Sequence, residues 1–178
     1  MTIDSSTLRR VLRPHASGVA VLTAVGACGP TGMTITSLTS VSAEPPLVAC
    51  ALADTSSTWR QIRSSRWYGI QLLRADQKDL AERFAVKGAA RFAGPVPWHT
   101  GRHGVPLLDG CLSWLICSPH RTIRLGDHDL LVGTVEHAGT GGPGVPLVHV
   151  HGSLHPFSRA TAADSATTAV TAPAATGI

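Results

Sequence analysis

The sequence predicts a mainly β protein, an antiparallel barrel with a few short helices at its periphery. Three observations favour this fold class. Short runs rich in β-branched and apolar residues recur along the chain, as is typical of strands. Segments with helical spacing are few and short. They do not alternate regularly with the strands, as the βαβ units of a parallel sheet require, so an antiparallel barrel fits best.

Length and composition indicate one folded domain. The chain has 178 residues, and 43% of them are hydrophobic, which is enough to bury one core. The segment 158–178 contains eight Ala and five Thr among its residues and has few large apolar side chains, so it cannot offset its ordering entropy. We therefore predict a domain at residues 1–157 and a disordered Ala/Thr-rich tail at residues 158–178.

The distribution of charged and apolar residues argues against nucleic-acid and membrane partners. Lys and Arg number 15 against 11 Asp and Glu, a net charge of +4, and the basic residues form no dense patch of the kind that binds nucleic acid. The longest apolar run, residues 47–53, is far shorter than the about 20 residues of a membrane span. The first residues also lack the basic-then-apolar order of a secretory signal. We expect a cytoplasmic protein.

The strands are predicted in order from their apolar runs and turn residues. Residues 18–24 lead through a glycine-rich turn at 26–32 into a second strand at 33–41, which indicates a hairpin. Pro45 and Pro46 end that pairing. Further strands are predicted at residues 47–53, 67–73, 111–116 with an extension to 125 as an alternative, 129–136 and 145–150.

Three short helices are predicted at residues 7–13, 58–64 and 76–85, where apolar side chains recur at helical spacing. Pro14 ends the first helix. Ser56 or Ser57 is the N-cap of the second, and Asp76 is available as the N-cap of the third.

Two clusters of hydroxyl side chains are candidate ligand sites. In residues 34–42, Thr or Ser occupies six of nine positions, and short hydroxyls with free backbone N–H groups suit a flat polar ligand or a phosphate. An edge strand with a solvated face explains the same pattern. The second cluster, residues 55–58, opens a predicted helix, where anions bind well. Plain N-capping explains it equally.

The segment 139–144 matches the G-x-G-x-x-G pattern of dinucleotide-binding folds. That fingerprint requires a strand before it and a helix after it, but here a strand signal follows. We interpret the segment as a flexible hairpin loop.

Histidine and cysteine patterns predict no metal site. His149 and His151 lie two apart on a predicted strand and so share a face, but beyond His155 no third ligand lies at a suitable spacing. The four cysteines form no C-x-x-C pair. Cys111 and Cys117 are expected on one face of a strand, and we interpret the cysteines as small buried hydrophobic residues kept reduced.

Several motifs, taken in order, resemble the short-chain flavin reductases, the reductase components of two-component flavin-dependent monooxygenases. The resemblance extends over nearly the whole predicted domain. The motifs are GVAVLT at 18–23, GMT at 32–34, SVSAEPPLV at 40–48, TWRQI at 58–62, DQKDLAERF at 76–84, RFAG at 91–94, GDH at 126–128 and PLVH at 146–149.

The resemblance implies an FMN-binding split barrel that dimerises with flavin near the subunit interface. The implied activity is that of an NAD(P)H:flavin oxidoreductase, which transfers a hydride from NADH or NADPH to FMN or FAD. Reduced flavin then passes to a partner monooxygenase. Two alternatives are a split-barrel protein that keeps FMN bound and acts on a small organic substrate, and a flavin-binding accessory protein without turnover.

The resemblance also implies roles for individual hydroxyl residues. Thr36 and Ser37 meet the flavin ring or ribityl chain, and Ser42 lies beside them. Ser57 and Thr58, at the start of a helix, hold the flavin phosphate.

The remaining implied site residues close the flavin site and bind the nicotinamide. Arg91 and Phe92 close the flavin site. His128, in the Gly-Asp-His turn, lies beside the nicotinamide and orients or electrostatically assists the transfer. The same pocket is lined by His149, His151 and Gly152.

Overall fold

The computed structural model describes residues 2–158. The predicted tail at residues 158–178 therefore lies, apart from Ser158, outside the described residues. Within them the chain forms three α-helices, α1 (Ser5–Leu12), α2 (Ser57–Ile62) and α3 (Lys78–Ala85), two 3-10 helices, η1 (Ala75–Gln77) and η2 (Arg102–Gly104), and twelve strands, β1 (Ser17–Gly18), β2 (Ala20–Gly26), β3 (Gly29–Ile35), β4 (Thr39–Ser42), β5 (Leu47–Ala53), β6 (Tyr68–Leu72), β7 (Trp98–Thr100), β8 (Pro106–Leu108), β9 (Ser113–Leu125), β10 (His128–Thr140), β11 (Leu147–Val150) and β12 (Ser153–Pro156).

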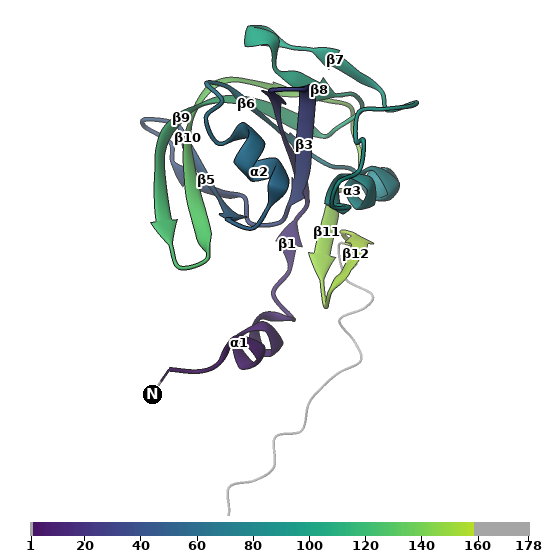
Figure 1. The fold of residues 1–178 in the computed structure, drawn as a ribbon. Helices are drawn as coiled ribbons and strands as arrows, with labels where there is room; N and C mark the ends of the chain where they lie inside the picture. The colour runs from purple at the N-terminus through teal and green to yellow at the C-terminus, as the bar shows by residue number, and fades with distance from the viewer. Residues whose placement is uncertain (1, 159–178) are drawn as a thin grey trace, which may run out of the picture.

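The largest sheet has seven strands in the order β3-β2-β6-β9-β10-β5-β4, and every neighbouring pair is antiparallel. Its two edges, β3 and β4, follow each other in the chain with only residues 36–38 between them. Because the chain advances at most about 3.6 Å per residue, this short link draws the edges together. The sheet curls round on itself (Figure 1), with β3 and β4 as its two unjoined edges. This antiparallel, mainly β architecture confirms the predicted fold class.

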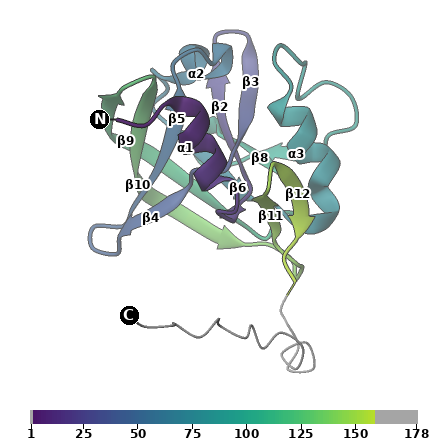
Figure 2. The same cartoon turned by 90° about the horizontal axis from the view of Figure 1, so that it is seen from below.

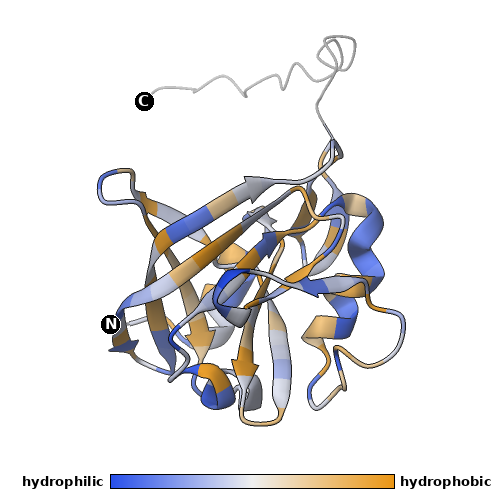
Figure 3. Cartoon of the chain, turned by 90° about the horizontal axis from the view of Figure 1, so that it is seen from above, coloured by the Kyte–Doolittle hydropathy of each residue, from blue (hydrophilic) through white to orange (hydrophobic). Residues whose placement is uncertain are grey.

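Strand β2 is buried on both faces. Leu22 and its neighbours at alternate positions lie in the barrel interior, whereas Val19 and Val21 pack outside it with Phe84 of α3 and Leu147 of β11. Because both faces are buried, the sequence of this strand is a continuous apolar run and not an alternation of apolar and polar residues. Figure 3 shows how hydrophobic segments gather in the strands that cross the molecule.

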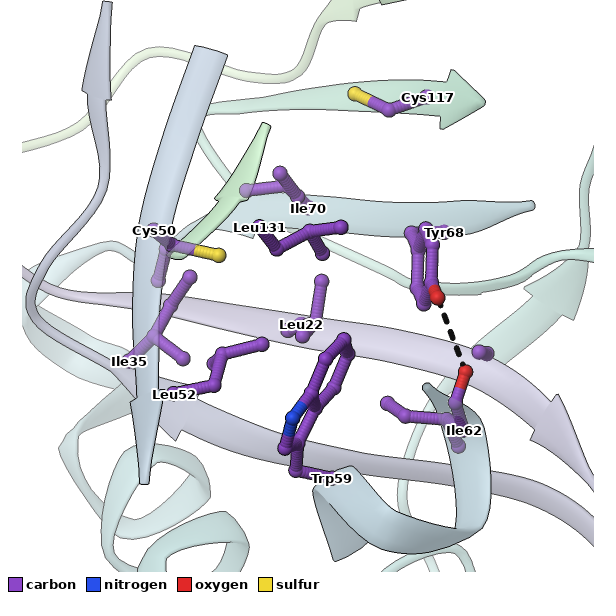
Figure 4. Packing of buried hydrophobic residues seen from close by; sticks show 12 residues of the cluster. Leu22, Ile35, Cys50, Leu52, Trp59, Ile62, Tyr68, Ile70, Cys117 and Leu131 are labelled. Carbon is purple, nitrogen blue, oxygen red and sulfur yellow. Dashed lines mark hydrogen bonds between the residues drawn. The ribbon is translucent and has the colours of Figure 1, made fainter. Parts of the chain in front are cut away.

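Helix α2 packs against the barrel interior. Trp59 and Ile62 are 1% and 0% exposed and join the interior cluster, into which both point (Figure 4). The Tyr68 hydroxyl donates a hydrogen bond to the Ile62 carbonyl (3.1 Å). Burying an indole of this size stabilises the barrel by about 2 to 3 kcal/mol, so this short helix depends on tertiary packing for its stability.

Two small sheets flank the barrel. One consists of β1, β11 and β12, and the other of β7 and β8. The sequence does not predict β1, β7, β8 or β12, because strands of two to four residues are too short to show an alternating pattern.

The prediction of one strand over residues 33–41 is wrong. The chain leaves the sheet after Ile35 and re-enters it at Thr39. Between them, the Ser37 hydroxyl donates to the Ala51 carbonyl (2.9 Å) and accepts from the Ala51 N–H (3.0 Å). A side chain thus replaces a backbone partner, which lets one predicted strand become both edges of the barrel.

Asp76 does not cap the third helix as predicted. Its carboxylate accepts a hydrogen bond from Arg74 Nε (2.9 Å) instead. The helical segment starts earlier, in η1, where the Gln77 side chain accepts from the Arg74 N–H (3.0 Å). The Gln77 N–H in turn donates to the Arg74 carbonyl (3.0 Å), so these two bonds close the first turn in place of a cap from Asp76.

The glycine-rich segment 139–144 is not a hairpin loop. Strand β10 continues to Thr140, and the chain then crosses to another sheet, where β11 pairs with β1 and β12. A Cβ at Gly139 would lie 2.5 Å from the Trp114 ring. Glycine at this position therefore permits close packing of the opposite strand.

Cys111 and Cys117 do not share a strand face. Cys111 precedes β9 and packs in the cluster around α3, whereas Cys117 lies in the barrel interior. Both are buried, as is Cys50, but Cys28 is exposed, and all are free thiols. The predicted pairing of His149 and His151 on one strand is also wrong, because His151 lies in the turn after β11 with a left-handed φ of 53°.

Helix α1 is set apart from the barrel in Figure 1 and lies in front of it in the view from below (Figure 2). None of its residues is buried, and Leu8, Val11 and Leu12 are each about half exposed or more. Arg13 connects it to the turn after β11, since the Arg13 carbonyl accepts from the His151 N–H (3.0 Å).

Candidate functional site

A cleft opens where the start of α2 faces β3 and the segment after α3. Its volume is about 350 Å³. The side chains that line it are mainly hydroxyls, basic groups and a few apolar groups: Met33, Thr34, Ala53, Thr55, Ser56, Ser57, Thr58, Phe84, Ala85, Lys87 and Arg91.

The hydroxyls at the start of α2 all border the cleft, but only one of them caps the helix. The Ser56 hydroxyl accepts a hydrogen bond from the Trp59 N–H (3.2 Å) and is the N-cap of the helix. The capping interpretation therefore accounts for Ser56. Ser57 and Thr58 do not cap the helix, and both line the cleft.

Arg91 is a buried basic residue of this cleft. It is 9% exposed, and its guanidinium donates to the Thr58 hydroxyl, to the Gly32 carbonyl (2.6 Å) and to the Val86 carbonyl (2.7 Å). Arg91 Nε is buried without a hydrogen-bond partner. Burial lowers the pKa of this guanidinium below its ordinary value, because desolvation disfavours the charged form.

The electrostatics of the cleft favour an anion. Lys87 and Arg91 both line it, and its lining includes no Asp or Glu. A buried cation without a carboxylate partner is costly, and an anionic ligand would offset that cost. Hydroxyls, an arginine fork and a lysine are the groups that bind phosphate oxygens. The residues present therefore fit the phosphate end of a flavin nucleotide.

Phe92, the neighbour of Arg91, points elsewhere. Its ring packs edge-on against Phe84 and Trp98, with ring centroids 5.2 and 5.3 Å apart. Phe92 thus belongs to the cluster around α3, and of the predicted pair only Arg91 lines the cleft.

His128 lies close to this cleft, at the first position of β10. It is paired in register with Ala53, a cleft residue. Its side chain is 44% exposed, and its Nδ1 lies 2.8 Å from the Asp127 carboxylate. This contact with His128 is the main reason why the pKa of Asp127 is lowered.

A backbone hydrogen bond ties the turn that carries His128 to the loop before α2. The Asp54 N–H donates to the Asp127 carbonyl (3.1 Å). Two candidates 70 residues apart in sequence, Thr58 and His128, are thereby brought to the same end of the barrel.

The hydroxyl run after β3 extends away from the cleft along β5. Thr36 is half-buried in the link between the edge strands, and Ser37 is opposite Ala51. Ser42 pairs with Leu47, at the far end of β5 from Ala53. Because strands rise about 3.4 Å per residue, Ser42 is about 20 Å along the sheet from the cleft and is not brought together with the α2 residues.

The last predicted group lies in a different pocket. His149 and Gly152 line a cavity of about 830 Å³ between α1 and the small sheet, together with Arg9 and Arg13. His151 is exposed beside it. Within one chain, these residues and His128 do not line one pocket.

Sequence reasoning missed Lys87 and Thr34 as cleft residues. Lys87 follows α3 in a segment without a periodic pattern, and only the fold brings it to the same cleft as Ser57. The Thr34 hydroxyl donates to the Ala81 carbonyl (2.6 Å), which fixes α3 against β3 at the cleft. The position of Thr34 in the hydroxyl run was the available signal.

Residues 2–158 contain no cluster of three or more His, Cys, Asp or Glu side chains arranged to hold a metal ion. In the same range, no helix is long and apolar enough to cross a membrane.

Comparison with known proteins identifies relatives of the whole domain. The family model described as a flavin reductase like domain matches residues 12–158. The NADH:FMN oxidoreductase of Rhodococcus erythropolis is 41% identical over 133 residues, which cover 75% of this chain and 69% of the relative. The actinorhodin polyketide dimerase of Streptomyces coelicolor is 38% identical over 151 residues, covering 84% of this chain and 85% of that protein.

A solved structure gives the same result. The NADH:FAD oxidoreductase SgcE6 of Streptomyces globisporus, in complex with NAD and FAD fragments, superposes with a TM-score of 0.80 at 31% identity, covering 89% of this chain and 97% of that one. The family match spans most of the chain, the two relatives are about 40% identical to it, and the solved structure has the same fold. The chain therefore belongs to the flavin reductase-like domain family.

Proposed function

We propose that this protein is an NAD(P)H:flavin oxidoreductase that reduces FMN or FAD and supplies the reduced flavin to a partner monooxygenase. The observation that carries the proposal is the basic, hydroxyl-lined cleft at the start of α2, whose buried Arg91 has no carboxylate partner there. Relatives are named for this chemistry, including the flavin-dependent monooxygenase reductase subunit HsaB of Mycobacterium tuberculosis, 34% identical over 75% of this chain.

The residues of the cleft hold the flavin nucleotide by its phosphate. Ser57 and Thr58 donate hydroxyl and backbone hydrogen bonds at the start of α2, and Arg91 and Lys87 supply positive charge. The link at residues 36–38 offers backbone groups to the polar edge of the flavin ring. Because the Ser37 hydroxyl is already hydrogen-bonded to the Ala51 backbone, Ser37 contributes its own backbone groups to the flavin site.

A bound flavin supplies the N5 atom that accepts a hydride from C4 of the nicotinamide. The protein has to hold two flat rings at reacting distance. In this proposal His128, half exposed beside the cleft, orients the nicotinamide. The Asp127 carboxylate holds the His128 ring through Nδ1, which leaves Nε2 to face the substrate.

We propose that the active form is a homodimer. The apolar side chains of α1 are largely exposed in the single chain, and contiguous exposed apolar surface marks interaction sites. In a dimer, the pocket between α1 and His149 would come from one protomer and His128, beside its cleft, from the other, so that both groups of residues would line one nicotinamide site.

We propose the cytoplasm as the location. The free state of all four cysteines suits a reducing compartment, and the proposed electron donors, NADH or NADPH, are available there.

The experiment is to follow absorbance at 340 nm with purified protein in air, using NADH or NADPH with catalytic FMN, FAD or riboflavin. Oxidation that depends on added flavin is expected. A preference for FMN or FAD over riboflavin is also expected, because riboflavin lacks the phosphate that the cleft binds. Equal rates of NAD(P)H oxidation with riboflavin and with FMN would show that the cleft does not bind the flavin phosphate.

Two other outcomes would favour the alternatives. Flavin that stays bound through purification would indicate a prosthetic group and a small organic substrate. Folded protein that binds flavin but oxidises neither nicotinamide would indicate an accessory protein.

A further inference from the structure

We infer that Asp129 is a positioning residue for hydride transfer, and that its hydrogen bond to Trp59 fixes His128 relative to the flavin-binding start of α2. This inference deepens the proposed function and rests on it. It concerns a bond between two residues, neither of which lines the cleft.

The bond joins two elements that are far apart in sequence. Trp59 Nε1 donates to Asp129 Oδ2 at 2.7 Å. The indole is 1% exposed, and the Asp129 side chain is 15% exposed. A hydrogen bond to a charged group in such a site is shorter and stronger than a neutral one at the surface.

The two partners are the immediate neighbours of the proposed functional residues. Trp59 follows Thr58, which lines the cleft, and Asp129 follows His128. The indole is anchored in the barrel core, so the carboxylate of β10 is held to a rigid point of α2. Movement of β10 against α2 would have to break this bond.

Arg124 completes the connection from the opposite strand. Its guanidinium lies 2.5 Å from Asp54 Oδ2 and 3.5 Å from Asp129 Oδ1, and its Nε donates to the Gly126 carbonyl (2.9 Å). One arginine thus holds both ends of the Gly-Asp-His turn and the loop before α2. It also neutralises the Asp129 carboxylate, which lowers the cost of its burial.

This arrangement matters because hydride transfer depends on geometry. A displacement of about 1 Å between reacting groups can lower a rate by about 100-fold. The backbone bond between Asp54 and Asp127 keeps the turn attached, so loss of the Trp59–Asp129 bond is expected to misalign the site without unfolding it.

The test compares variants of the full chain under saturating flavin and nicotinamide. Asp129→Ala and Trp59→Phe each remove the bond, and the phenyl ring retains most of the core packing. We expect kcat to fall about 10- to 100-fold in both, while KM for flavin changes less than threefold. The double variant should be no worse than the single variants, because both remove the same bond. Asp129→Asn keeps an acceptor oxygen for the indole and should restore most of kcat.

Ser118→Ala is the matched control. The Ser118 hydroxyl also bonds a carboxylate between β9 and β10, that of Glu136 (2.7 Å), but far from the turn. It should leave kcat unchanged. If Asp129→Ala and Trp59→Phe lower only the melting temperature and leave kcat unchanged, the bond is merely structural and the inference is overturned.

A second measurement does not depend on turnover. FMN added to the wild type should shift the NMR resonances of the His128 ring, and at saturating FMN this shift should be altered in Asp129→Ala but not in Ser118→Ala. An identical shift in all three proteins overturns the inference. If the wild type is active and Asp129→Ala changes neither kcat nor the His128 shift, the inference fails but the proposed function stands. If the wild type neither binds FMN nor oxidises NADH, the proposed function fails and the inference fails with it.

Discussion

The Arg91 guanidinium donates a hydrogen bond to the hydroxyl of Thr58, 33 residues earlier in the chain. This contact connects the segment after α3 to the first turn of α2. Because Arg91 also bonds the Gly32 carbonyl, one side chain reaches three segments that border the cleft. It is the feature from which the flavin-binding proposal is built, and its loss should affect ligand affinity more than that of any other cleft residue.

Replacing Arg91 with Met should weaken FMN binding about 10- to 100-fold, since a hydrogen bond to a charged group contributes about 1.5 to 3 kcal/mol. Titration of FMN by fluorescence quenching measures this effect. Arg83→Met is the control, because Arg83 bonds the Ala90 and Ala93 carbonyls of the same segment but does not line the cleft. Equal loss of affinity in both variants would mean that the segment is merely disordered by either change.

The serines at the start of α2 should separate into two effects. Ser56→Ala removes the N-cap and should lower the free energy of unfolding by about 1 kcal/mol, with little change in FMN affinity. Replacing Ser57 and Thr58 together with Ala should weaken FMN binding by about 1 to 3 kcal/mol. Thermal unfolding and FMN titration of both variants test this. An unaltered FMN Kd in the double variant would return the cluster to a purely structural role.

His128→Ala should raise KM for the nicotinamide or slow hydride transfer, and should leave FMN affinity nearly unchanged, because the side chain lies beside the cleft without lining it. Steady-state kinetics at varied NADH and a separate FMN titration distinguish the two effects. Kinetics equal to those of the wild type would exclude His128 from the site.

Gly69→Ala should lower the free energy of unfolding by about 1 to 3 kcal/mol through overpacking. A Cβ there would lie 2.4 Å from Thr23 Oγ1 and 2.8 Å from Val105 Cγ1, and the Thr23 hydroxyl is committed to the Pro106 carbonyl (2.6 Å). Gly18→Ala is the control, since a Cβ at Gly18 meets no atom within 4 Å. Urea unfolding measures the stability of both variants. Equal unfolding midpoints would contradict the close packing around Gly69.

The buried thiols should be unreactive in the folded protein. Burial raises the pKa of Cys50 and Cys117 to about 12 and that of Cys111 to about 11, whereas Cys28 is exposed. At pH 8, a thiol reagent should therefore modify Cys28 alone until denaturant is added. Because these pKa values are raised in the folded state, their stabilising effect is present below the ordinary thiol pKa of 9.0 and is lost as pH rises toward about 12. Rapid modification of more than one thiol in native protein would contradict this burial.

The sequence determined the local elements of this protein and the residue types of its site. The apolar runs of β2 and β5 and the stripe of α3 follow from side-chain periodicity, which depends only on neighbouring residues. The hydroxyl cluster before α2 and the Gly-Asp-His turn were visible for the same reason. The resemblance to flavin reductases came from the order of such motifs along the chain.

The tertiary structure alone decided which of these residues meet. That Ser56 caps α2 while Ser57 and Thr58 line the cleft depends on how the helix docks on the barrel. The approach of His128 to Ala53 depends on the register of β10 against β5, and the Trp59–Asp129 bond spans 70 residues. Such contacts follow from long-range strand pairing and packing, for which no local pattern exists in the sequence.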